Sequence, residues 1–146
     1  MNLRLPLPLR RALLAAMCVL GSQAFAAEYT ASTLEEFQAA WNQMANGDTL
    51  NITGSIDFEG IELSALPADA AIVLKSDGHG KISNFNYKDM SAVEMQDLNV
   101  DGEGTVRVGS MTEGMLSGRS DAGNTLSIED GSTLDGTWLV LENNKL

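Results

Sequence analysis

The chain has 146 residues and a formal net charge of −11, from 20 acidic and nine basic side chains. This excess of carboxylates argues against a nucleic-acid-binding protein, because phosphates are bound through Lys and Arg. It also argues against docking on an anionic membrane leaflet. We interpret the acidic surface as a means of staying soluble outside the cell.

Residues 1–26 are predicted to be a secretory signal peptide. Three arginines come first, residues 12–20 form a short apolar run, and Ala24-Phe25-Ala26 offers the small residues of a cleavage site. The apolar run is too short to span a bilayer comfortably, which disfavours the alternative of an N-terminal anchor helix. We therefore expect export to the periplasm, the outer cell surface or the extracellular space.

Cleavage after Ala26 leaves residues 27–146 as a single domain, with six basic and 20 acidic residues and a charge of −14. Cys18, the single cysteine of the chain, is lost with the leader. Disulfides, thiol catalysis and thiolate metal sites are therefore not expected in the exported protein.

An amphipathic helix is predicted over residues 33–44, at the start of the exported chain. Ser32 or Thr33 can cap it, and Glu35, three residues after Ser32, completes a capping box. Gly47 is a suitable left-handed residue to end it. The helix tryptophan is expected to plug a core rather than to serve as a ligand platform. The apolar stripe consists of Leu34, Phe37, Ala40, Trp41 and Met44.

After the helix, short alternating apolar runs are punctuated by Gly, Asp and Asn. The expected strand centres Ile52, Leu74, Val100 and Ile128 follow one another at loosely regular intervals, each close to the length of one solenoid coil. A β-sandwich with regularly spaced turns gives a similar pattern. The helix favours the solenoid, whose open first coil must be covered against edge pairing. Residues 58–69 read as a loop that leaves the coil around its proline.

We therefore expect an all-β fold, a right-handed parallel β-helix with an N-terminal capping helix at about 33–44 and about four to five stacked coils.

The segment Ser32–Ile52, with Ile72–Ile82 behind it, resembles the N-terminal cap and first coils of the pectin-lyase-like superfamily. Within that superfamily the acidic, cysteine-free exported chain is most similar to passenger domains of bacterial autotransporters and to β-helix adhesins. Residues 124–134 and 136–141 have the texture of passenger repeats. The chain stops inside what reads as a repeat. It is thus expected to be a truncated passenger, to be completed by a partner chain, or to dimerise through an open solenoid end.

The resemblance also implies where chemistry would lie, because enzymes of the superfamily cleave acidic polysaccharides with clustered Asp carboxylates, often with Ca²⁺, and a basic residue. No matching cluster is evident. Asp77 and Asp101 each precede a glycine and can align on successive coils, with Glu103 nearby. Stacked carboxylates can bind Ca²⁺, but a turn role for both Asp-Gly pairs is the favoured interpretation.

Other reactive side chains do not form a recognisable site. His79 is the lone histidine and has no nucleophile motif beside it. Arg107 and Arg119 are interpreted as surface ion pairs rather than as a lyase base. We therefore assign no catalytic, cofactor-binding or metal-binding residue, and expect no cofactor. Four methionines are interpreted as core filler, namely Met90, Met95, Met111 and Met115.

The favoured function is a non-enzymatic, secreted or surface-displayed β-helix module of the adhesin or autotransporter-passenger type. Its expected partner is a host-surface or matrix glycan or protein, with self-association through the open end as a second possibility. The alternatives are a polysaccharide lyase or hydrolase on the same fold and a nonfunctional gene fragment. Acidic side chains stacked on one exposed face beside a basic residue would favour the enzyme.

Overall fold

The computed structural model describes residues 25–102, 104–119 and 124–142. Almost all of the expected leader therefore lies outside the described residues. The described chain is mostly β-strand, with a single α-helix, α2 (Leu34–Trp41), and one short 3-10 helix, η1 (Met90–Ala92). Every strand pair in it is parallel. The expectation of a β-rich fold is thus confirmed.

The largest sheet, which we name sheet A, has six strands in the order β1-β2-β4-β6-β9-β12. Its strands are β1 (Glu28–Ala31), β2 (Thr49–Ile52), β4 (Ile72–Lys75), β6 (Val93–Gln96), β9 (Ser110–Thr112) and β12 (Leu134–Asp135). Their register places apolar residues from successive strands side by side. One such inward row is Leu50, Leu74, Met95, Met111 and Leu134.

A second sheet, sheet B, has five strands in the order β13-β10-β7-β5-β3. They are β3 (Ser55–Asp57), β5 (Lys81–Ser83), β7 (Asn99–Gly102), β10 (Met115–Arg119) and β13 (Trp138–Glu142). Sheet C consists of β8 (Thr105–Val108) and β11 (Thr125–Ile128). The inward row of sheet B is Ile56, Ile82, Val100, Leu116 and Leu139.

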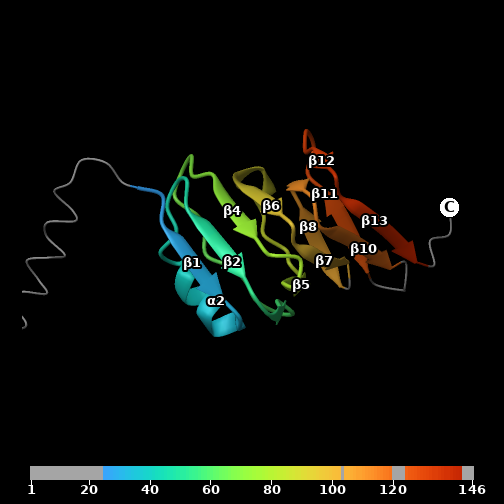
Figure 1. Cartoon of the computed structure of the whole chain (residues 1–146), viewed down its shortest axis with the longest axis horizontal. Coiled ribbons are helices and arrows are strands. Elements are labelled where there is room, and N and C mark those ends of the chain that lie inside the picture. The colour runs from blue at the N-terminus through green and yellow to red at the C-terminus, as the bar shows by residue number, and fades with distance from the viewer. Residues whose placement is uncertain (1–24, 103, 120–123, 143–146) are drawn as a thin grey trace, which may run out of the picture.

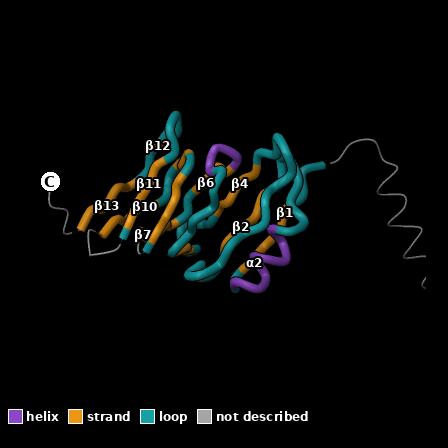
Figure 2. Tube along the Cα trace, turned by 180° about the vertical axis from the view of Figure 1, so that it is seen from behind, coloured by secondary structure: helices purple, strands orange, loops and turns teal. Residues whose placement is uncertain are grey.

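The chain visits the sheets in a fixed order. From β6 onward it passes through A, B and C as β6-β7-β8, then again as β9-β10-β11, and continues into A and B as β12-β13. Neighbouring strands of one sheet therefore come from successive passes. The result is an elongated stack with β1 and α2 at one end and β13 at the other (Figures 1 and 2).

The repeat expected from the sequence is wrong in its assignment of strand centres. Ile52 and Leu74 belong to sheet A, whereas Val100 lies in sheet B and Ile128 in sheet C. Alternation of apolar and polar residues shows that a segment is a strand, but not which sheet it joins. The in-register partner of Leu74 on the next pass is Met95, and not Val100.

The predicted helix is present but shorter, and its capping box lies one residue later than expected. Thr33 is the N-cap, and its hydroxyl accepts a hydrogen bond from the backbone N–H of Glu36 at 3.2 Å. The Glu36 carboxylate in turn accepts from the backbone N–H of Ser32 at 2.7 Å. The helix ends at Trp41, so Gly47, although left-handed with φ 85°, lies beyond its end.

Helix α2 covers the core at the end of the stack where β1 lies (Figure 1). Its inward side chains are buried, with Phe37 0% and Trp41 2% exposed. Phe37 meets Phe58 edge to face with ring centroids 4.7 Å apart, and Trp41 meets Tyr87 at 4.9 Å. The helix therefore seals this end with an aromatic cluster, as its apolar stripe indicates.

The segment between β3 and β4 forms a loop, as expected, but it packs on the core instead of leaving it. Phe58 is 2% exposed. The Trp41 indole N–H donates to the Ser64 carbonyl at 2.8 Å, and the Leu66 N–H donates to the Tyr87 hydroxyl at 3.0 Å. Within the described ranges, the structure contains no helix with the length and apolar character needed to cross a membrane.

Candidate binding faces

Asp77 and Asp101 do not align, which argues against the alternative of stacked carboxylates; the favoured turn role is confirmed for Asp77 but is wrong for Asp101. Asp77 lies in the turn after β4, where its carboxylate accepts from the His79 N–H at 3.1 Å. Asp101 lies within β7 of sheet B. The turn that contains Asp77 instead contacts Asp97. The backbone N–H of Gly78, the residue after Asp77, donates to the Asp97 carbonyl. Glu103 lies outside the described residues.

The other reactive residues also lie apart. His79 is exposed, and the Arg107 guanidinium donates to the carbonyl of Lys88 at 3.1 Å; among the described residues it forms no ion pair. The side chain of Arg119 is outside the described part. Met115 is 37% exposed because it points outward from β10, so the core role holds for only three of the four methionines. The buried three are Met90, Met95 and Met111. The residues described contain no group of three or more His, Cys, Asp or Glu side chains placed to hold a metal ion.

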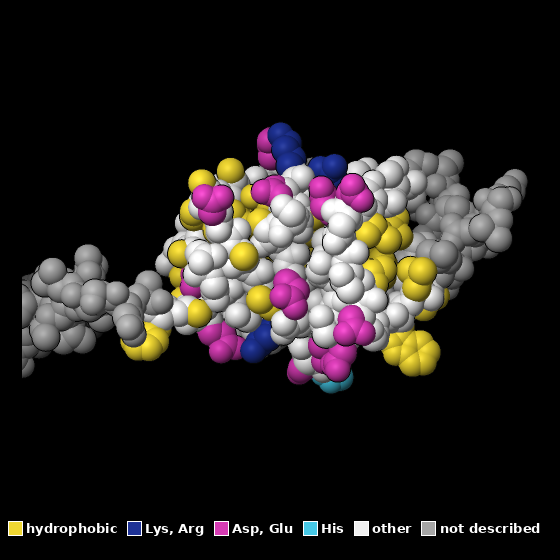
Figure 3. Space-filling view, turned by 90° about the horizontal axis from the view of Figure 1, so that it is seen from above, with side chains coloured by type: hydrophobic (Ala, Val, Ile, Leu, Met, Phe, Trp, Pro, Cys, Tyr) yellow, Lys and Arg dark blue, Asp and Glu magenta, His cyan; other side chains and the backbone are white. Residues whose placement is uncertain are grey.

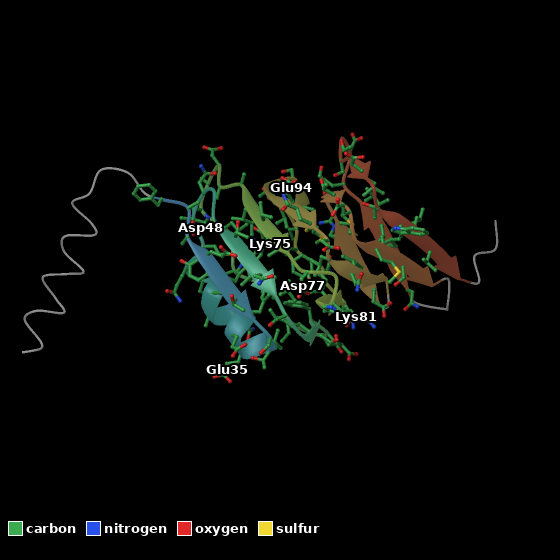
Figure 4. All side chains as sticks on the ribbon, viewed as in Figure 1. Glu35, Asp48, Lys75, Asp77, Lys81 and Glu94 are labelled. Carbon is green, nitrogen blue, oxygen red and sulfur yellow. The ribbon has the colours of Figure 1, made fainter. Side chains whose placement is uncertain are left out.

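The outer face of sheet A is polar and mixed in charge. Lys75 on β4 reaches across to Glu28 on β1, with Nζ and Oε1 3.2 Å apart. On β6 the Gln96 amide donates to Glu94 at 3.1 Å. Figure 4 shows Lys75 and Glu94 on these neighbouring strands. Both members of the ion pair are well exposed, so the pair contributes little to stability.

The outer face of sheet B, which we name the B face, changes character along the stack. Near its start Lys81 pairs with Asp101 at 2.9 Å, and the Asp101 side chain is only 13% exposed. Near its end the face becomes apolar, and Trp138 is 76% exposed. The register gives two outward rows, Ser55-Lys81-Asn99-Met115-Trp138 and Asp57-Ser83-Asp101-Ser117-Val140. This face combines hydrogen-bonding groups with an exposed aromatic platform.

A groove lies beside the sheets, between the loop after β3 and the segment after β5. Its volume is about 320 Å³. Lys88 and Glu62 face each other across it at 3.9 Å, and both are largely exposed. The Tyr87 hydroxyl is already occupied by the N–H of Leu66. The groove lining thus presents one cation, Lys88, and two carboxylates, Glu62 and Asp89, to a small polar ligand.

Two carboxyls have perturbed pKa values, and both shifts are downward. Hydrogen bonds from the backbone and hydroxyl of Ser32 lower the pKa of Glu36 at the helix start. A hydrogen bond from the Asn84 amide, with a second from the Glu59 N–H, lowers the pKa of Asp57. A lowered pKa keeps a carboxyl ionised, so both groups act as acceptors at neutral pH.

We expect Asn84→Gly to raise the pKa of Asp57 towards its ordinary value of about 3.9. Asn84 has φ 55°, so glycine keeps the left-handed turn while the donor 2.8 Å from Asp57 is removed. Because the folded pKa is lowered, the carboxylate stabilises the fold above the unfolded pKa, and this contribution disappears as pH falls through the folded value. NMR titration of the Asp57 carboxyl carbon measures the midpoint, and an unchanged midpoint in the variant would contradict the assignment.

Comparisons with protein-family models, with curated proteins and with solved structures found no match for this chain. The pectin-lyase-like resemblance therefore remains an expectation.

Proposed function

We propose that the parallel sheets form a right-handed parallel β-helix of the pectin-lyase-like type. Three observations support this proposal. All strand pairs of the described chain are parallel, and from β6 onward the chain passes through the sheets in a fixed order. Residues in register come from successive passes. The handedness follows from the strong preference of parallel crossovers for the right-handed connection. A helix over the first coil fits the same architecture.

On this fold we propose an exported, non-enzymatic binding module of the adhesin or passenger type, displayed at the cell surface or secreted. The observation that carries it is the B face, which places a 76% exposed tryptophan in register with Met115 and Asn99 on neighbouring strands. An aromatic side chain that is mostly exposed adds little burial to the fold, and together with the exposed Met115 and Val140 beside it Trp138 forms an apolar patch of the kind found at recognition surfaces. The leader expected at residues 1–26 would deliver the face to the outside of the cell.

The B face has the geometry of a surface for an extended ligand. Parallel strands lie about 4.8 Å apart, so outward side chains repeat at that interval along the stack. The positive charge of Lys81 offsets the negative charge of Asp101. Among the other residues of the two outward rows only Asp57 is charged. We therefore propose a neutral or weakly charged glycan, or a protein surface, as the partner class.

Binding of the secreted protein to immobilised glycans and matrix proteins tests this function. Trp138→Ala is expected to weaken the strongest interaction at least about tenfold, as loss of an aromatic anchor does. Gln96→Ala, on the outer face of sheet A, is the matched control and should bind like the parent. Equal loss in both variants would move the site away from the B face, and no binding to any polymer would overturn the proposal.

One observation favours the enzyme as a second candidate. Asp57 and Asp101 lie in one row of the B face with Ser83 between them, and Lys81 pairs with Asp101. This partly meets the criterion of stacked acids beside a base. Release of reducing ends or unsaturated products from acidic polysaccharides, abolished by Asp101→Asn, would support the lyase or hydrolase. Polymer binding without turnover would support the binding module.

A further inference from the structure

Asp48, directly before β2, carries a buried carboxylate. It is 5% exposed, and among the described residues it is the one acidic or basic residue that is buried. Its Oδ1 accepts from the backbone N–H of Ala27 at 2.7 Å, and its Oδ2 accepts from that of Ala45 at 2.7 Å. No Lys, Arg or His of the described ranges forms an ion pair with it. Because a buried charge with neutral donors alone is costly, a cation at this site would stabilise the fold.

The donor to Oδ1 belongs to the residue at which the exported chain is expected to begin. The leader is predicted to end at Ala26, so the Ala27 nitrogen is the atom that cleavage releases. Figure 4 shows Asp48 close to the start of β1. Ala27 is held in place there, because its carbonyl accepts from the Thr49 N–H at 2.9 Å. Cleavage therefore changes the charge of a nitrogen that already contacts the carboxylate.

Removal of the leader by a signal peptidase turns this nitrogen from a neutral amide into a cation. Water adds to the Ala26 carbonyl, and the bond between that carbonyl and the Ala27 nitrogen breaks. The leader departs with the new carboxylate, and both hydrogens of the water end on the nitrogen as an ammonium group. Terminal ammonium groups are mostly protonated at neutral pH. The hydrogen bond to Asp48 then joins two opposite charges and becomes stronger.

We propose that Asp48 is the binding site for the α-ammonium group that leader removal creates at Ala27. This inference rests on the export proposed above, and it makes the stability of the fold depend on processing. Other cations are scarce, with six basic and 20 acidic residues after Ala26. On the face shown in Figure 3, Asp and Glu side chains are more widespread than Lys and Arg. The new terminus supplies the charge that Asp48 lacks, so the uncleaved chain is less stable than the exported one.

Thermal unfolding of the exported product, obtained from the full chain with its leader, tests the pair. N-terminal sequencing first establishes that the product begins at Ala27. Its α-amino group is then acetylated in urea, where its ordinary pKa of about 7.8 lies far below that of Lys, and the protein is refolded. The acetyl group restores a neutral amide in the place of the Ala26 carbonyl. Acetylation should raise the unfolding equilibrium constant about tenfold and lower the melting temperature by about 5 °C.

Two substitutions identify the partner of the ammonium group. In Asp48→Asn the free and acetylated chains should melt at the same temperature, because no carboxylate remains at the site. Glu28→Gln is the matched control. Glu28 follows Ala27 directly, but its side chain is exposed and pairs with Lys75, so acetylation should destabilise this variant as much as the parent. High salt should preserve the effect in the parent, since a buried pair is screened far less than surface charges.

Three results would overturn the pair: equal melting of the free and acetylated parent, the same loss in Asp48→Asn as in the parent, or disappearance of the loss at high salt. The salt result decides without any substitution. None of the three bears on binding by the B face. An exported product that begins at another residue would also overturn the pair but would still support export. A chain that keeps residues 1–26 and stays inside the cell would contradict both.

Discussion

Trp41→Ala is expected to lower the free energy of unfolding by about 3–5 kcal/mol, the cost of emptying a large aromatic site in a core. Trp41 is 2% exposed and stacks on Phe37 with ring centroids 5.6 Å apart. Its indole N–H also fixes the Ser64 carbonyl at 2.8 Å, so the loop after β3 loses an anchor together with the core. Urea unfolding followed by far-UV circular dichroism measures the loss.

Two variants separate the causes of that loss. Trp41→Phe keeps most of the apolar contact but removes the donor of the Ser64 carbonyl, which costs about 0.5–1.5 kcal/mol because Ser64 is exposed and water can replace the donor. Trp138→Ala removes the same residue type from an exposed position and should stay within about 0.5 kcal/mol of the parent. If Trp41→Ala were no more costly than Trp138→Ala, α2 would not be the seal of the first end.

The helix could be predicted from the sequence because its signals are local. The apolar stripe around Phe37 and Trp41 repeats at the helical period, and a hydroxyl followed by Glu marks its start. Even so, Ser32 and Thr33 are both suitable caps, serine being the better by type, and yet the structure selects Thr33. That choice depends on where β1 delivers the chain, which local sequence does not encode.

The assignment of strands to sheets could not be predicted, because it depends on partners distant in the sequence. Leu74 and Met95 are neighbours only because the intervening corner has the right length. Methionine is also a weak marker of a strand, so the sequence indicates core filler at Met95 and Met111 and not strand centres. Degenerate repeats hide their period when each pass uses loops of different length.

The candidate faces were equally hidden from the sequence. The sequence draws attention to Asp101 only through the glycine that follows it. In the structure Asp101 forms an ion pair with Lys81 on the neighbouring strand, 2.9 Å away. In the sequence Trp138 is noticed only as one residue of a repeat. In the structure it points outward from the last strand and is the most exposed tryptophan of the described chain. An outward or inward position follows from register, and register is a property of the whole sheet.

Gly80→Ala is expected to destabilise the fold by about 3 kcal/mol, at the upper end of the usual cost of overpacking. Gly80 lies at the corner between β4 and β5, where its N–H donates to the Ser76 hydroxyl at 2.6 Å and its carbonyl accepts from Asn99. A β-carbon there would collide with the backbone oxygen of Ile52 and lie 2.5 Å from the Ser76 oxygen. Backbone atoms cannot yield as a flexible side chain does, so two passes of the chain would have to separate.

His79→Ala is the matched control for this corner. His79 is the preceding residue and its side chain is exposed, so the change should stay within about 0.5 kcal/mol of the parent. Thermal unfolding of the parent, Gly80→Ala and His79→Ala is the measurement. A loss in Gly80→Ala alone would mean that successive passes touch at Gly80, whereas a loss in both variants would mean that any change in this turn destabilises the fold. Equal melting temperatures for Gly80→Ala and the parent would mean that the end of β2 and the corner before β5 do not touch. In that case successive passes of the chain would not be stacked as tightly as their register indicates.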